Sequence, residues 1–335
     1  MILLCAQLGL MLLVILLAAE LFTNALEHLG ERMGISEGVT GSLFAAVGTA
    51  LPETMVPVIA IFAGTQNAAV NEDIGVGAIL GAPLMLSTLS TCLMALSVLR
   101  QRGLRGRLRP ERSGLVRDLN VFLLAFLIAA AAMFLPPGLH AMRILLSVLL
   151  VAIYVGYVAL TYRASGSLVE AGHGTAAEEP ILLTRLGLKE NLATIALQLL
   201  LALLLLVGGA KGFISGVEGV SQALGISALV LSLLIIPVAT ELPEKVNSIL
   251  WARRGKDTLA FGNITGAMVF QGTLLPALGI LLTPWQPRPE VLSGVVITLL
   301  AAAWLRLNAS GDGLRVLALA ASGMLYLTYL SITLL

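Results

Sequence analysis

Two Pro-Glu motifs inside apolar segments are the residues of this chain best suited to chemistry. Residues 47–53 read VGTALPE, and residues 238–244 read VATELPE. A proline within a helix removes a backbone N–H and displaces the carbonyl four residues earlier, so we expect Pro52 and Pro243 to open their helices. A carboxylate beside freed carbonyl oxygens is the outline of a cation site, and each motif ends in a glutamate.

These two glutamates, Glu53 and Glu244, are costly if they lie at bilayer depth. An unpaired carboxylate there costs on the order of 3 kcal/mol. A single such residue could simply be hydrogen-bonded and fix helix packing. A glutamate repeated beside a repeated proline favours a functional pair, so we predict that both are metal ligands in a cation-binding site.

Two threonines precede the glutamates by four residues, one helical turn back on the same face. Thr49 and Thr240 would add hydroxyl oxygens to the carboxylates and freed carbonyls. Oxygen ligands of these kinds suit hard cations such as Ca²⁺ or Na⁺. A lone threonine in a membrane helix usually bonds to its own backbone, so the threonines only support the prediction.

Two polar residues of the second copy have apolar counterparts in the first. Glu241 corresponds to Ala50, and Gln271 corresponds to Leu86. We predict that Glu241 and Gln271 shape the cation site. Lys245 lies four positions after Glu241, so a local ion pair between these two residues is the alternative for Glu241.

A second repeated motif follows each Pro-Glu motif. GAILGA begins at Gly77, and GNITGA begins at Gly262. Gly77 and Gly81, like Gly262 and Gly266, have the spacing that allows helices to approach closely. We expect this close packing to bring their helices against the opened segments.

The elements that must position these residues are transmembrane helices. The chain is 58% hydrophobic and 12% charged, whereas soluble domains have about 25% charged residues. With about 20 apolar residues per span, the sequence predicts an all-α integral membrane protein with about ten transmembrane helices. The first is expected to be retained and not to be a cleaved signal peptide. The spans are expected at residues 2–23, 37–63, 73–99, 119–135, 141–162, 190–212, 224–252, 257–282, 291–306 and 314–334.

The repeated motifs divide the chain into two halves. Residues 33–53 align without gaps on residues 224–244, at an offset of 191. We expect a first five-span repeat at residues 1–162, a cytoplasmic connector at 163–189 and a second five-span repeat at 190–335. Because five is an odd number, the second repeat must insert upside down, which gives two inverted repeats.

Basic residues predict the orientation in the membrane. Seven arginines lie between Arg100 and Arg117, and most other lysines and arginines lie in loops on the same side. The opposite side has only Arg143, Lys211 and Arg288. The positive-inside rule places the Arg-rich loop 100–117 in the cytoplasm and both termini outside. A cell (plasma) membrane location is expected.

The motifs resemble those of the calcium/cation antiporter superfamily, which includes the sodium/calcium exchangers. That family has Gly-Thr-Ser-x-Pro-Glu-like motifs, here GTALPE and ATELPE, each followed by a Gly-Asn-x-x-Gly-Ser-Asn-like motif. The resemblance implies that the acidic residues and threonines form central cation sites. The motif serines are replaced by Ala50, Glu241, Ala82 and Ala267. The resemblance therefore implies fewer bound ions than in a typical exchanger.

The function expected from these residues is secondary antiport of Ca²⁺ or a related cation against Na⁺ or H⁺ by alternating access, at a carboxylate site at the bilayer midplane. Inorganic cations and the lipid bilayer are the expected partners, with no nucleic acid and no cofactor. The alternative is a non-transporting or ion-sensing membrane protein with a partly decayed site. No HExxH or Gly-x-Ser-x-Gly motif indicates an enzyme.

Overall fold

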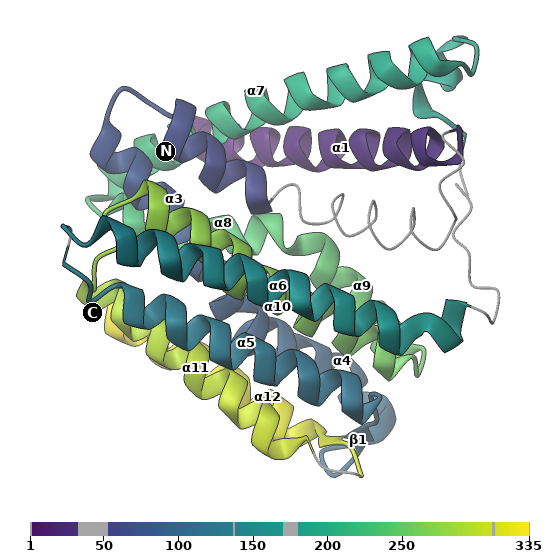
Figure 1. The fold of residues 1–335 in the computed structure, drawn as a ribbon, viewed down its shortest axis with the longest axis vertical. Coiled ribbons are helices and arrows are strands. Elements are labelled where there is room, and N and C mark those ends of the chain that lie inside the picture. The colour runs from purple at the N-terminus through teal and green to yellow at the C-terminus, as the bar shows by residue number, and fades with distance from the viewer. Residues whose placement is uncertain (1, 33–52, 137, 170–179, 310–311, 335) are drawn as a thin grey trace. The chain divides into compact units, whose positions relative to one another are not determined.

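The computed structural model describes residues 2–32, 53–136, 138–169, 180–309 and 312–334, and it is helical almost throughout (Figure 1). The all-α class is confirmed. The elements are α1 (Ile2–Arg32), a helix at Glu53–Ala63, α3 (Ala68–Met85), the π-helix η1 (Leu86–Ser90), α4 (Thr91–Arg102), β1 (Arg107–Leu108), α5 (Arg112–Ala132), α6 (His140–Val169), the 3₁₀-helix η2 (Leu182–Leu186), α7 (Leu192–Leu224), α8 (Ala228–Thr240), α9 (Leu242–Arg253), α10 (Asp257–Leu282), α11 (Pro289–Asn308), β2 (Leu314–Arg315) and α12 (Val316–Leu334).

Eight helical stretches in the described residues are long and apolar enough to cross a membrane, and two further apolar helices are shorter. The shorter ones, Glu53–Ala63 and Ala228–Val238, fall in the two expected spans that carry the Pro-Glu motifs. The architecture of about ten membrane segments is therefore confirmed. Several boundaries were wrong: the span expected at 190–212 extends to Leu224, and the one expected at 119–135 begins at Arg112.

The chain forms two compact units, and each contains segments from both sequence halves. The first unit comprises Met1–Asn71 and Leu160–Ile226, and the second comprises Glu72–Ala159 and Ser227–Leu335. Compact units and sequence repeats are thus different divisions of this chain.

The first unit is organised around α1 and α7, which lie side by side (Figure 1). Four glycines of α7 face large side chains of α1, and added β-carbons would contact those side chains. The facing pairs are Gly209 with Ile15, Gly212 with Met11, Gly216 with Leu8 and Gly219 with Leu4. Because the numbers rise on one helix as they fall on the other, the helices are antiparallel, and glycine is needed for their close approach.

Two buried amides tie this helix pair to the connector. The Gln198 Nε2 atom donates to the Leu21 carbonyl at 2.9 Å and to Asn24 Oδ1 at 2.8 Å. Gln198 Oε1 accepts from the backbone N–H of Leu183 at 3.0 Å. Amides deep between apolar helices are stable only when hydrogen-bonded, so these contacts fix the register of α1 against α7.

The second unit has one hydrophobic core, to which helices α3–α6 and α8–α12 contribute buried side chains. α10 packs on α5, where Phe122 lies against Gly272, and Trp285 lies over Gly279. The Trp285 indole donates to the Ala129 carbonyl at 2.9 Å. An added β-carbon at either glycine would overlap an aromatic ring, so the two glycines allow aromatic rings to fill the space between the helices.

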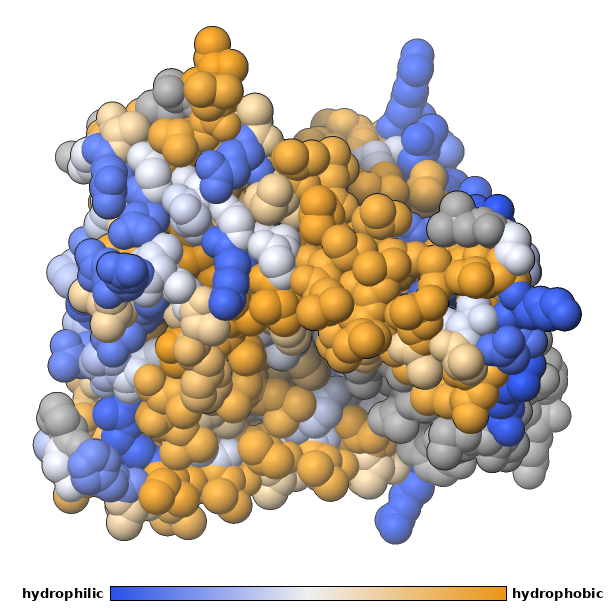
Figure 2. Space-filling model, turned by 90° about the horizontal axis from the view of Figure 1, so that it is seen from above, coloured by the Kyte–Doolittle hydropathy of each residue, from blue (hydrophilic) through white to orange (hydrophobic). Residues whose placement is uncertain are grey.

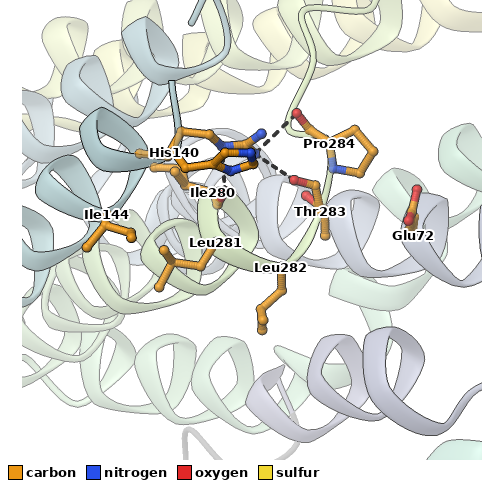
Figure 3. A pocket seen from close by; sticks show the side chains of 9 residues that line it. Glu72, His140, Ile144, Ile280, Leu281, Leu282, Thr283 and Pro284 are labelled. Carbon is orange, nitrogen blue, oxygen red and sulfur yellow. Dashed lines mark hydrogen bonds between the residues drawn. The ribbon is translucent and has the colours of Figure 1, made fainter. Parts of the chain in front are cut away.

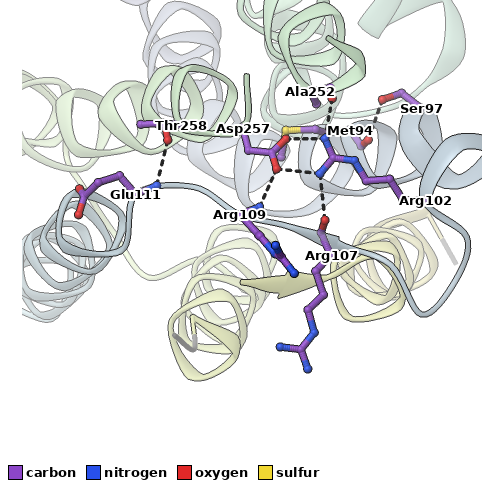
Figure 4. Close-up of polar contacts among 9 residues, drawn as sticks. All are labelled: Met94, Ser97, Arg102, Arg107, Arg109, Glu111, Ala252, Asp257 and Thr258. Carbon is purple, nitrogen blue, oxygen red and sulfur yellow. Dashed lines mark hydrogen bonds and ion pairs between the residues drawn. The ribbon is translucent and has the colours of Figure 1, made fainter. Parts of the chain in front are cut away.

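A polar cluster joins four elements at the Arg-rich end of the second unit (Figure 4). Arg102 at the end of α4 donates through two nitrogens to Asp257 at 2.7 and 2.8 Å, and to the carbonyls of Arg107 and Ala252. Asp257 also accepts from the backbone N–H of Arg109 at 2.6 Å. Bidentate Arg–carboxylate pairs are strong and directional, so this cluster holds α4, α9, α10 and the β1 segment together.

The N-terminus of α5 is held in the same region. Glu111 is the N-cap of α5, and its carboxylate accepts from the backbone N–H groups of Gly114 and Ser113. These hydrogen bonds, led by the one from Gly114, lower the pKa of Glu111. The backbone N–H of Glu111 donates to Thr258 Oγ1 of α10 (Figure 4).

Exposed apolar side chains are abundant on the surface. Figure 2 shows hydrophobic residues, in orange, over a large part of one face. Helix α6 is an example, since Ile144, Leu145, Val148 and Val155 are all exposed. Soluble proteins rarely expose so much contiguous apolar surface, because its contact with water is unfavourable. Contact with lipid chains is not, so this surface suits a membrane environment.

Candidate cation site

The second Pro-Glu motif lies at a break between two helices. Helix α8 ends at Thr240, α9 begins at Leu242, and Glu241 between them has φ −87° and ψ 7°. Pro243 lies in the first turn of α9, where its missing N–H costs no hydrogen bond. Glu244 also lies in this first turn. The chain thus changes helix within the expected span 224–252.

Glu241 and Gln271 meet at this break. The Gln271 Nε2 atom of α10 donates to Glu241 Oε1 at 2.7 Å, and both side chains are fully buried. Thr240, also buried, donates to the Ile236 carbonyl at 3.1 Å and so bonds to its own helix. These two residues, whose counterparts in the first half are apolar, are therefore direct partners, 30 residues apart in the chain.

Lys245 brings a positive charge to the same place. Its side chain is buried, and its Nζ atom donates to the carbonyls of Pro237 at 2.9 Å and Val238 at 3.4 Å. These carbonyls belong to the last turn of α8, where the negative end of the helix dipole lies. The ammonium is thus held at the C-terminal end of this half-helix.

The first motif is described only in part. Thr49 and Pro52 lie outside the described residues, whereas Glu53 begins the described part of the helix Glu53–Ala63 and is only 4% exposed. Within the described residues no cluster of three or more Asp, Glu, His or Cys side chains is arranged to hold a metal ion. Metal binding by Glu53 and Glu244 together stays a prediction.

The four repeated glycines differ in their surroundings. β-carbons added at Gly77 and Gly81 would overlap α8, the first within 2.9 Å of the Leu229 carbonyl oxygen. Near Gly266 the closest described atom is the Tyr157 hydroxyl oxygen, 3.8 Å from an added β-carbon, and at Gly262 no described atom lies within 4 Å. Gly77 and Gly81 thus allow α3 to approach α8 closely, whereas the surroundings of Gly262 and Gly266 indicate no such approach to α8.

Replacing Gly81 with alanine is expected to lower the free energy of unfolding by about 1–3 kcal/mol, the usual cost of overpacking. The new β-carbon would lie 2.5 Å from the Leu233 carbonyl oxygen and 2.6 Å from Pro237 Cγ. Thermal unfolding of the purified protein measures the effect. Gly156→Ala is the matched control, because Gly156 is exposed on α6 and has no neighbour there among the described atoms. Equal stability of both variants would contradict close packing at Gly81.

Two further polar contacts of α10, one of them fully buried, were not predicted from the sequence. Asn263 donates to Ser248 of α9 at 3.0 Å. Thr265 donates to Asp118 of α5 at 2.7 Å, and Arg117 lies 3.5 Å from the same carboxylate. Asp118 lies one residue before the span expected at 119–135, so its burial was not expected. Asn263, by contrast, belongs to the GNITGA motif, which could have drawn attention to it.

A pocket of about 440 Å³ lies apart from these residues, at the C-terminal end of α10. Figure 3 shows its lining, which includes Glu72, His140 and Thr283. The Arg143 guanidinium, also in the lining, donates to the carbonyls of Ile280, Thr283 and Pro284 at 2.9, 2.6 and 3.2 Å. This guanidinium caps α10, which makes the pocket a poor place for a transported cation.

Comparisons with known proteins agree with this architecture. The family described as sodium/calcium exchanger protein matches residues 3–163 and 194–335. The inner membrane protein YrbG of Escherichia coli K12 is 26% identical over 316 residues, covering 91% of this chain and 90% of its own. The solved structure of the H⁺/Ca²⁺ exchanger CAX has a TM-score of 0.62 at 17% identity, covering 98% of this chain and 88% of that one. A structure of the sodium-calcium exchanger NCX_Mj has a TM-score of 0.56 at 19% identity, covering 98% of both chains.

Proposed function

Because the chain belongs to the sodium/calcium exchanger protein family, we propose that it exchanges Ca²⁺ or a related cation for Na⁺ or H⁺ by alternating access. It is a multi-pass membrane protein and a transporter by family, not an enzyme. The observation that carries the proposal is the buried contact between Glu241 and Gln271 at the break between α8 and α9. Broken helices with polar groups at the break are typical binding sites of secondary transporters.

The cation is proposed to bind the carboxylates of Glu53 and Glu244, with Thr49 and Thr240 adding oxygens. Glu241, at the break between α8 and α9, and Gln271 of α10 would orient the site. Carboxylates without a bound cation are costly in a medium of low dielectric constant. The protein with an empty site should therefore rarely switch its opening from one side of the membrane to the other. This cost would make exchange obligatory, since either Ca²⁺ or the coupling ion must neutralise the site in each direction.

Flux in proteoliposomes tests the proposal. The purified protein is reconstituted into vesicles that contain a Ca²⁺ indicator, and Na⁺ or H⁺ gradients are imposed separately. We expect Ca²⁺ movement driven by one of the two gradients, which identifies the coupling ion. If neither gradient moves Ca²⁺, exchange of Ca²⁺ is excluded, and the non-transporting alternative, favoured by Ala50, Ala82 and Leu86, gains support.

The protein is proposed to lie in the cell membrane, with both termini outside and the loop 100–117 in the cytoplasm. The name of the E. coli relative, an inner membrane protein, supports this location. Alkaline phosphatase fused to the C-terminus is expected to be active, because the enzyme folds only outside the cytoplasm. A fusion ending within the loop 100–117 should be inactive, and the reverse result would invert the orientation.

A further inference from the structure

The place of Lys245 in the sequence repeat is unusual. At the offset of 191 residues, Glu241 and Lys245 correspond to Ala50 and Thr54. The second half therefore has one extra carboxylate and one extra ammonium, four residues apart at the break between α8 and α9. The two additions are opposite in charge, so together they leave the formal charge of the motif unchanged.

The described contacts of Lys245 are with backbone carbonyl oxygens, a kind of ligand that also binds monovalent cations. Its Nζ atom lies 2.9 Å from the Pro237 carbonyl oxygen and 3.4 Å from the Val238 carbonyl oxygen. The side chain is only 6% exposed, so protein groups replace most of the hydration of the ammonium. In transporters with broken helices, the C-terminal end of a half-helix and its unwound carbonyls are where coupling ions are coordinated.

The buried Glu241 carboxylate supplies the negative charge that such a cation needs. Glu241 lies one helical turn before Lys245, and Gln271 fixes its Oε1 atom by a hydrogen bond of 2.7 Å. A fixed carboxylate beside the end of a half-helix would attract a mobile cation if the ammonium were removed. Backbone carbonyl oxygens and a buried carboxylate thus lie together around the position of Lys245.

We propose that Lys245 is a built-in monovalent cation, which occupies the end of α8 in place of Na⁺ and lowers by one the number of monovalent cations that the protein binds. Removing the side-chain charge should open this position to Na⁺. The binding part of this inference is independent of transport, whereas its effect on stoichiometry rests on the proposed exchange function.

Binding is tested by thermal unfolding of the purified full-length protein. NaCl is titrated at constant ionic strength against N-methyl-D-glucamine chloride, a cation too large for the site. We expect Lys245→Met to gain a saturable rise in Tm with Na⁺ beyond that of the wild type, because a ligand that binds only the folded state stabilises it. Lys256→Met is the matched control, since Lys256 is exposed in the loop before α10, and it should respond like the wild type.

Further variants separate a built-in cation from a simple helix cap. The double variant Glu241→Gln/Lys245→Met lacks the attracting carboxylate and should lose the added Na⁺ response. Should Lys245→Met not fold, Lys245→Gln serves in its place. The inference is overturned if the single variant is only less stable and responds to Na⁺ as the wild type does, because Lys245 would then merely cap α8.

Transport gives a second test. The number of charges moved per Ca²⁺ is obtained from the membrane potential that stops net flux in proteoliposomes, set with K⁺ and valinomycin. We expect Lys245→Met to move one more monovalent cation per cycle than the wild type, and an unchanged number would contradict the inference. If the wild type itself moves no Ca²⁺, the proposed function fails, and the Na⁺ titration alone decides the role of Lys245.

Discussion

Glutamine in place of either Glu53 or Glu244 is expected to weaken cation binding strongly and so to slow cation exchange in proteoliposomes. Each substitution keeps the size of the side chain and removes one negative charge from the proposed site. Truncating one partner of a buried charged contact costs about 2–5 kcal/mol, which corresponds to a loss of roughly 30-fold or more in cation affinity. The readout is the initial rate of Ca²⁺ movement at several Ca²⁺ concentrations, under the gradient that drives the wild type.

Glu20→Gln is the matched control for this result. Glu20 also lies on an apolar helix, α1, but its side chain is exposed, whereas Glu53 is 4% exposed. We expect the control to exchange at the wild-type rate. Thermal unfolding of each variant shows whether lost exchange reflects lost folding. If Glu53→Gln exchanged at the wild-type rate, Glu53 would not be a ligand of the transported cation.

Replacing Arg102 with methionine is expected to lower the free energy of unfolding by about 2–3 kcal/mol. Removal of one partner from a buried ion pair costs about 3–5 kcal/mol because the other charge is left uncompensated. The partial exposure of Arg102, 21% against 8% for Asp257, places the effect at or below the lower end of that range. Thermal unfolding of the purified protein measures the loss.

An exposed ion pair in the same region provides the comparison. Arg107 lies 2.9 Å from Asp312, whose side chain is 82% exposed. Asp312→Asn should therefore change the free energy of unfolding by less than about 1 kcal/mol. If Arg102→Met were as stable as Asp312→Asn, the cluster around Asp257 would not hold α4, α9 and α10 together.

Hydropathy alone was sufficient to predict the membrane segments. An apolar run of about 20 residues has few alternatives to a spanning helix, because only helices satisfy every backbone group in lipid. Helix ends were harder to predict, since polar residues extend helices beyond the apolar run. Helix α7 continues through Lys211 and Glu218 to Leu224, and α5 begins six residues before Asp118.

Residues of the candidate site were predicted from the sequence, but the contacts between them were not. The symmetry of the repeat singled out Glu241 and Gln271 as polar residues with apolar counterparts, and the structure brings them within 2.7 Å of each other. The sequence left open how Lys245 is used, because an ammonium can reach a carboxylate or a carbonyl from the same position. The described contacts of Lys245 include the Pro237 and Val238 carbonyls, and the ion pair with Glu241 stays a prediction.

Helix pairing could not be predicted, because lipid-facing and protein-facing surfaces have nearly the same composition. The glycines of α7 that receive side chains of α1 resemble any other glycines in an apolar run. The π-helix at Leu86–Ser90 was missed for a similar reason. Its hydroxyl groups bond back to the preceding turn, as Ser87 does to the Pro83 carbonyl, and such bonds leave no periodic signal.

The antiparallel packing of α1 on α7 has a consequence for biogenesis. These are the first helices of the two sequence halves, and α5 and α10, which also pack together, likewise come from different halves. While the ribosome is still making the second half, the helices of the first are already in the bilayer without their partners. Insertion must therefore precede assembly, and the nascent first half has to remain loosely packed until translation is nearly complete. Although the sequence repeats, the packing of each half is therefore completed by helices of the other.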